Sequence, residues 1–312
     1  PEHPAYRVSL ATAERAAGRG EAARGILEET AKRFPREASA FELLGVLHHE
    51  EGRLEEAAAA FEKALALEPT RPRLGEALER VKRDLALEAG YSREGSIHFD
   101  FRYDVERSDL VKGAGVLAGM LDEAWEAVAL ELGEYPTERH QVVLYAGQTF
   151  REVTGTGEYV GGLFDGRIRV PVGSLFRQRE SLPPVLRHEV THAFLHRMAP
   201  GLPVWAGEGL AQRLEGRDPR MADGAVRAAR ERLLEPAQLR GSFLDLKDPA
   251  RIRLAYSMSL SFVDWLYRYR GREATLRYVR GIRERGEEKS FAEAFGCSFA
   301  DGLALWLEEI GP

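Results

Sequence analysis

The sequence predicts two structural parts, an N-terminal α-solenoid of helical hairpins and a C-terminal α+β domain. Three observations lead to this prediction. Small and apolar residues recur after 34 positions within residues 1–70. From Ser96 onward, apolar residues alternate along short segments, as expected for half-buried strands. After residue 181 the pattern is mainly helical, and strands that precede helices are typical of an α+β domain.

The repeating pattern divides residues 1–70 into two helix-turn-helix units. Small residues mark positions where paired helices approach closely, and a proline ends each second helix. The equivalent positions are Leu10, Ala11, Gly18, Ala23, Leu27, Thr30 and Pro35 in the first unit and Leu44, Gly45, Gly52, Ala57, Phe61, Ala64 and Pro69 in the second. This pattern resembles the tetratricopeptide repeat (TPR), whose units stack into solenoids. The resemblance is compatible with a protein partner at the surface of the repeats.

Residues 71–93 are expected to cap the solenoid and connect it to the next domain. The charged, amphipathic stretch 72–89 predicts one further helix that closes the short solenoid. Because two repeats are few for independent stability, we expect this part to pack against the domain that follows.

The domain assigned to residues 94–312 begins with predicted strands that form a small mixed sheet. The strand pattern is clearest where Ile97, Phe99 and Phe101 alternate with polar residues. Pro171 lacks an N–H group, which places the last strand at a sheet edge. The predicted elements are a strand at 97–103, a helix at 108–132, a strand at 141–145, a short helix at 149–153 and a strand at 166–172, followed mainly by helices.

The stretch His188-Glu-Val-Thr-His192 carries the most chemical information, and it lies in a predicted helix that ends before Pro200. Residues four apart lie on one face of a helix, so both imidazoles can reach one metal ion. Glu189 lies one step around that face, where it can act on a water molecule at the metal without being a ligand. The spacing therefore favours a zinc site of the kind that peptidases use.

A second segment, Trp205-Ala-Gly-Glu208-Gly, begins the next predicted helix. Together the two segments resemble the gluzincins, the thermolysin-like zinc peptidases, and most closely their bacterial peptidase MA-like branch. The resemblance covers about residues 96–312. It implies Glu189 as the general base, and one Zn²⁺ per chain held by His188, His192 and Glu208. Two alternatives remain open: a solvated helix whose histidines bind nothing, and a pseudo-enzyme that keeps zinc without turnover.

The same resemblance assigns roles to two residues outside the ligand set. Related peptidases carry a tyrosine at the start of a comparable helix, which implies Tyr256 as the stabiliser of a developing oxyanion. The alternative for Tyr256 is a packed aromatic residue in a helix. The family often has an acidic residue four positions after the glutamate ligand, where this chain has Gln212. Its amide oxygen could accept a hydrogen bond from a ligand imidazole, without the charge of a carboxylate.

An edge strand near the zinc binds an extended peptide by strand addition in this family. The resemblance therefore implies substrate-binding positions at Gly162, Ile168 and Val170, with Gly162 allowing close backbone approach. The alternative is an ordinary hairpin edge that follows a glycine-rich turn.

The composition excludes several classes of function. A net charge of −6 argues against general polyanion binding, so no nucleic-acid partner is expected. Cys297 is the only cysteine, which excludes an internal disulfide and a cysteine-rich zinc site. No apolar run approaches the roughly 20 residues that span a bilayer. The sequence starts at Pro1, so a signal or anchor segment could precede it, and a cytoplasmic and an exported location are both left open.

These observations favour a zinc-dependent peptidase that hydrolyses peptide or protein substrates and recruits a protein through its TPR module. The alternative is a non-catalytic TPR scaffold or adaptor that carries a degenerate zinc-binding domain.

Overall fold

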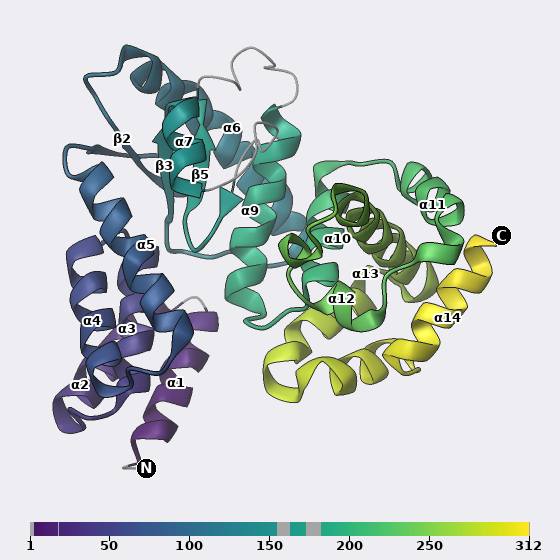
Figure 1. The fold of residues 1–312 in the computed structure, drawn as a ribbon, viewed down its shortest axis with the longest axis horizontal. Helices are drawn as coiled ribbons and strands as arrows, with labels where there is room; N and C mark the ends of the chain where they lie inside the picture. Colours follow the sequence, from purple (N-terminus) through teal and green to yellow (C-terminus); the bar gives the residue numbers. More distant parts are fainter. Residues whose placement is uncertain (1–2, 18, 155–162, 173–181, 312) are drawn as a thin grey trace. The chain divides into compact units, whose positions relative to one another are not determined.

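The computed structural model describes residues 3–17, 19–154, 163–172 and 182–311 (Figure 1). The chain divides into two compact units, Pro1–Ala193 and Phe194–Pro312. The first unit holds the N-terminal helices together with the sheet. In the described residues of the second unit, the regular secondary structure consists of helices joined by turns and short connections.

The first five helices follow the predicted pattern of two hairpins and one further helix (purple to blue in Figure 1). Gly45 allows the two helices of the second hairpin to approach, because a Cβ at this position would lie 2.7 Å from the Phe61 ring. Gly52 has φ +68°, a left-handed conformation that suits the tight turn inside this hairpin. The helices are α1 (Pro4–Ala16), α2 (Gly20–Arg33), α3 (Ala38–Glu50), α4 (Leu54–Leu67) and α5 (Pro72–Glu88).

Two apolar cores hold these helices together. One core joins α1, α2 and α3 and includes Ala11, Leu27 and Leu44. The other joins α4 to α5 and includes Phe61 and Leu78. Each helix has one buried face, so the predicted capping helix buries its apolar stripe against the second hairpin.

The sheet of the first unit is mixed, as predicted, with strand order β1-β2-β3-β5-β4. Strands β2, β3 and β5 run parallel, while β1 and β4 run antiparallel to their neighbours. Every residue of β3 is buried, so this central strand is covered on both faces. The elements are β1 (Ser92–Gly95), β2 (Phe99–Tyr103), α6 (Ser108–Leu132), β3 (His140–Tyr145), α7 (Gly147–Thr154), β4 (Leu163–Phe164) and β5 (Ile168–Pro171).

Two details of the predicted sheet are wrong. Strand β5 is not an edge strand at its start, because β4 pairs with it at Ile168 and Arg169. Pro171 lies beyond these two pairs, which is where a residue without an N–H group is tolerated. The predicted strand at 97–103 begins only at Phe99, and Ile97 before it is 74% exposed.

The helices that follow carry the candidate site. Helix α13 contains two breaks, at Gly271 and Gly286, where φ values of +83° and +76° favour glycine. An aromatic core around Trp205, Phe262 and Phe291 holds this part of the chain together. The elements are α9 (Leu182–Met198), α10 (Val204–Glu215), α11 (Pro219–Ala228), η2 (Arg230–Arg232), α12 (Pro236–Arg240), η3 (Phe243–Leu246), α13 (Pro249–Phe295) and α14 (Phe299–Ile310).

None of the described helices combines the length and apolar character that crossing a bilayer requires.

Candidate metal centre

Helix α9 presents both histidines of the motif on one side, as the spacing predicted. Its apolar stripe, which includes Leu186, Val190 and Phe194, is fully buried. His188 and His192 lie away from this stripe and are only partly buried. They are therefore not core residues, and their rings can meet a ligand.

The two imidazoles converge on one point. Their Nε2 atoms lie 3.1 Å apart, and the ring centroids of His188 and His192 are 4.8 Å apart at an interplanar angle of 73°. Two nitrogens bound to a tetrahedral zinc ion at roughly 2.0–2.1 Å would lie roughly 3.3 Å apart. The separation of the ring nitrogens thus fits two ligands of one zinc ion.

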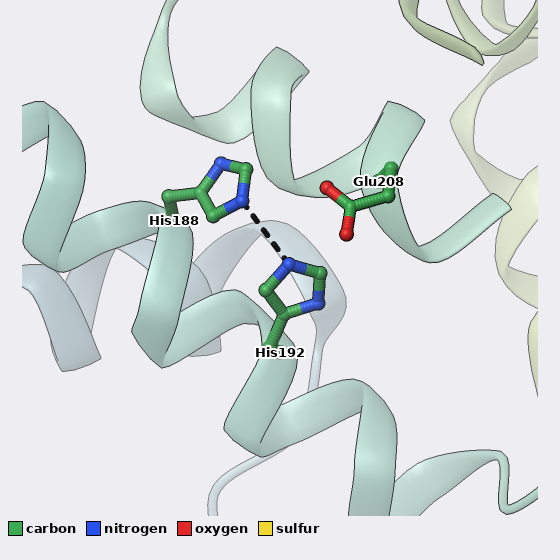
Figure 2. A group of neighbouring side chains, drawn as sticks. All are labelled: His188, His192 and Glu208. Atoms are coloured by element: carbon green, nitrogen blue, oxygen red, sulfur yellow. Dashed lines mark hydrogen bonds between the residues drawn. The ribbon is translucent and has the colours of Figure 1, made fainter. Parts of the chain in front are cut away.

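Glu208 completes a group of three possible ligands. Ligand atoms of His188, His192 and Glu208 all lie within 4.8 Å of one another. Figure 2 shows the Glu208 carboxylate directed towards the imidazole pair. Two imidazoles and one carboxylate suit a catalytic zinc site, which keeps a fourth position open. Among the residues that the structure describes, this is the one cluster of three or more such side chains.

The start of α10 brings Glu208 to this position. Helix α9 ends in a turn at Gly201, which has φ +89°, and Pro203 then precedes the first turn of α10. Trp205 anchors that turn, because its buried ring stacks on Tyr278 with centroids 5.8 Å apart. The Trp-x-x-Glu spacing then places Glu208 about one turn further along the helix.

Gly209, next to Glu208, lets α10 lie directly against α13. A Cβ at this position would overlap the Ser259 carbonyl oxygen and the Val263 side chain. This role of Gly209 was not predicted from the sequence. A glycine inside an amphipathic helix was the only available signal, and it could not identify the neighbouring helix.

Gln212 makes a different contact from the one expected. Its Nε2 donates hydrogen bonds to the carbonyl oxygens of Glu208, at 3.2 Å, and Tyr256, at 3.0 Å. The side chain is buried, so these bonds satisfy polar groups that water does not reach. Gln212 therefore holds α10 to α13, while its predicted hydrogen bond to a ligand imidazole stays a prediction.

The proposed catalytic residues Glu189 and Tyr256 lie on α9 and α13. Glu189 follows His188 on α9 and is 7% exposed. Tyr256 lies on α13, where its ring packs edge-on against Phe243 at a centroid distance of 5.3 Å. This contact agrees with the alternative of a packed aromatic residue, and the oxyanion role of Tyr256 stays a prediction.

The predicted substrate strand is only partly described. Ile168 and Val170 have no exposed surface. At Ile168, strand β5 is already paired with β3 on one side and with β4 on the other. Gly162 lies outside the described residues. Substrate binding at these three positions stays a prediction.

Comparison with known proteins bears on the first part of the chain. A family model for the tetratricopeptide repeat matches residues 8–72. This part of the chain is similar to TPR repeats. The TPR match confirms the prediction from the 34-residue period and supports a role in protein interaction. No curated protein matches the chain.

Proposed function

We propose that this protein is a zinc-dependent peptidase with a TPR module that binds protein. The observation that carries the proposal is the convergence of His188, His192 and Glu208 within 4.8 Å. A helical face that presents two imidazoles to a carboxylate on the next helix is an arrangement suited to catalytic zinc.

Each residue of the group has a defined part in this reaction. His188, His192 and Glu208 would hold the metal. Bound zinc supplies a Lewis acid and lowers the pKa of water to about 7. Glu189 takes a proton from the attacking water and passes it to the leaving amine. Tyr256 is assigned to donate a hydrogen bond to the developing oxyanion.

The test compares metal content with peptide cleavage in the same preparations. We expect one zinc ion per chain and turnover on a broad peptide library. Glu189→Gln keeps the zinc and loses turnover, whereas His188→Ala loses both. Glu123→Gln, at an exposed position of α6, is the matched control and retains both. Unchanged turnover in Glu189→Gln would refute the assigned base.

A non-catalytic TPR scaffold is the second candidate. The TPR match favours it, and so does the uncharged Gln212 at a position where related peptidases often carry an acid. Stoichiometric zinc that chelators remove, together with no turnover on the library, would support the scaffold over the peptidase.

A further inference from the structure

Polar side-chain pairs connect α1 to α3 and α3 to α5 along one face of the helical module. Arg15 of α1 pairs with Glu50 of α3, and His49 of α3 pairs with Asp84 of α5 at 3.2 Å. Each pair joins positions 35 residues apart, close to the repeat period. We call the surface formed by Arg15, His49, Glu50, Asp84 and Glu88 the first-helix face.

The turn between β4 and β5 lies against this face. Asp165 donates its backbone N–H to the carbonyl of Arg167 at 3.3 Å, and Gly166 between them has φ +104°. A Cβ on Gly166 would lie 3.4 Å from Glu50 Cγ and 3.5 Å from His49 Nδ1. The backbone of the turn is therefore in close contact with the C-terminal end of α3.

Arg167 of this turn and Arg169 of β5 extend into the acidic part of the first-helix face. Arg167 donates to Asp84 at 2.6 Å and to both oxygens of Glu88 at 2.8 and 2.9 Å. Arg169 donates to both oxygens of Asp84 at 2.9 and 2.7 Å. The side chains of Arg167 and Asp84 have no exposed surface. Bidentate, water-excluded pairs of this kind are specific in geometry.

In this cluster, neighbouring opposite charges offset the cost of burying each carboxylate. Burial alone would raise the pKa of Asp84, but hydrogen bonds from His49 and Arg169 and the charge of Arg167 hold it well below its usual value. Burial would also raise the pKa of Asp165, but the charge of Arg169 and its hydrogen bonds lower that pKa. Buried charges persist only where each has partners, so removing one member leaves the others uncompensated.

We propose that the helical module formed by the TPR repeats and their capping helix α5 binds the Asp165–Arg169 segment of its own chain, as an internal ligand of the first-helix face. The repeats then act as a clamp on β5, and an external partner of the repeats binds elsewhere on their surface. The clamp does not depend on the zinc chemistry, since none of its residues belongs to the metal centre.

Hydrogen–deuterium exchange on the full chain tests the clamp. Arg167→Met should raise amide exchange rates both in the second half of α5 and in β5, on the order of tenfold or more. Arg151→Met, at an exposed position of α7, is the control and leaves both segments protected. Faster exchange in only one of the two segments, or in neither, would overturn the proposal.

A second variant and a measurement on the unchanged protein cover the case in which Arg167→Met does not fold. Asp84→Asn keeps the shape of the side chain and should loosen the same two segments. In the unchanged protein under mild urea, α5 and β5 should open together, with one common free energy. If the amides of α5 and β5 exchanged with different free energies of opening, the proposed clamp would be contradicted. Zinc content is measured in parallel, so a failure of the peptidase proposal is recognised independently.

Discussion

The side chain of Gln212 donates a hydrogen bond of 3.0 Å to the backbone carbonyl of Tyr256, and so ties α10 to α13 one turn after Glu208. The same nitrogen also bonds to the Glu208 carbonyl at 3.2 Å. Because the helix that carries the proposed carboxylate ligand is held by a buried amide, its position depends on this side chain.

Replacing Gln212 with Met should lower the free energy of unfolding by about 1–3 kcal/mol, since a buried carbonyl would lose its donor. Urea unfolding measures this loss. Zinc affinity, measured by competition with a fluorescent chelator, should fall as well because Glu208 is less well positioned. Gln148→Met, on the exposed side of α7, is the control. Equal stability of the two variants would contradict the proposed tie.

Gly209→Ala should destabilise the protein by about 1–3 kcal/mol, because the added methyl group overlaps α13 and forces the helices apart. The neighbouring Gly207 offers a matched control, since its Cβ would meet only Leu202 Cδ2 at 3.9 Å. Gly207→Ala should therefore be neutral or stabilise by up to about 1 kcal/mol through helix propensity. Thermal unfolding of both variants checks the difference, and a cost in Gly207→Ala as large as that in Gly209→Ala would count against close helix packing as its cause.

Zinc should stabilise the folded protein in a way that depends on the motif. At a free zinc concentration about 100 times the dissociation constant, zinc binding should raise the free energy of unfolding by about 2.7 kcal/mol. His192→Ala should lose this zinc-dependent shift of the melting temperature. His98→Ala should keep it, because that imidazole stacks on Trp125 at 3.7 Å in another part of the chain. If zinc raised the melting temperature of His192→Ala as much as that of the unchanged protein, His192 would not be a zinc ligand.

The stability of the folded protein should decrease at acidic pH because of Asp84. Its pKa is lowered in the folded state, so its contribution is fully present above the unfolded value of about 3.9 and is lost as the pH falls towards the lower folded value. The stability difference between the unchanged protein and Asp84→Asn should therefore be constant from pH 7 to about pH 5 and shrink below about pH 4. Urea midpoints at these pH values measure it, and a constant difference down to pH 3 would contradict this assignment.

Local features of the chain were predictable because they depend on residues close in sequence. The period of 34 residues placed the hairpins, and the i, i+4 spacing of His188 and His192 placed both rings on one side of α9. The short strand at Leu163–Phe164 was missed, since two residues carry no alternating pattern. The assignment of β5 to the sheet edge rested on Pro171, and it did not foresee that β4 pairs with the start of β5.

The sequence by itself determined the repeats, the order of most helices and strands, and the histidine pair, because helix and strand periods act over a few residues. Only the tertiary structure decided that Asp84 and Glu88, members of a charged helix, are buried against Arg167 and Arg169 about 80 positions later. It also decided that Gln212 bonds to Tyr256. Such contacts form where segments that are distant in sequence pack together, and burial there sets the strength of each charge interaction or hydrogen bond. The local sequence pattern does not indicate which distant segments will pack together.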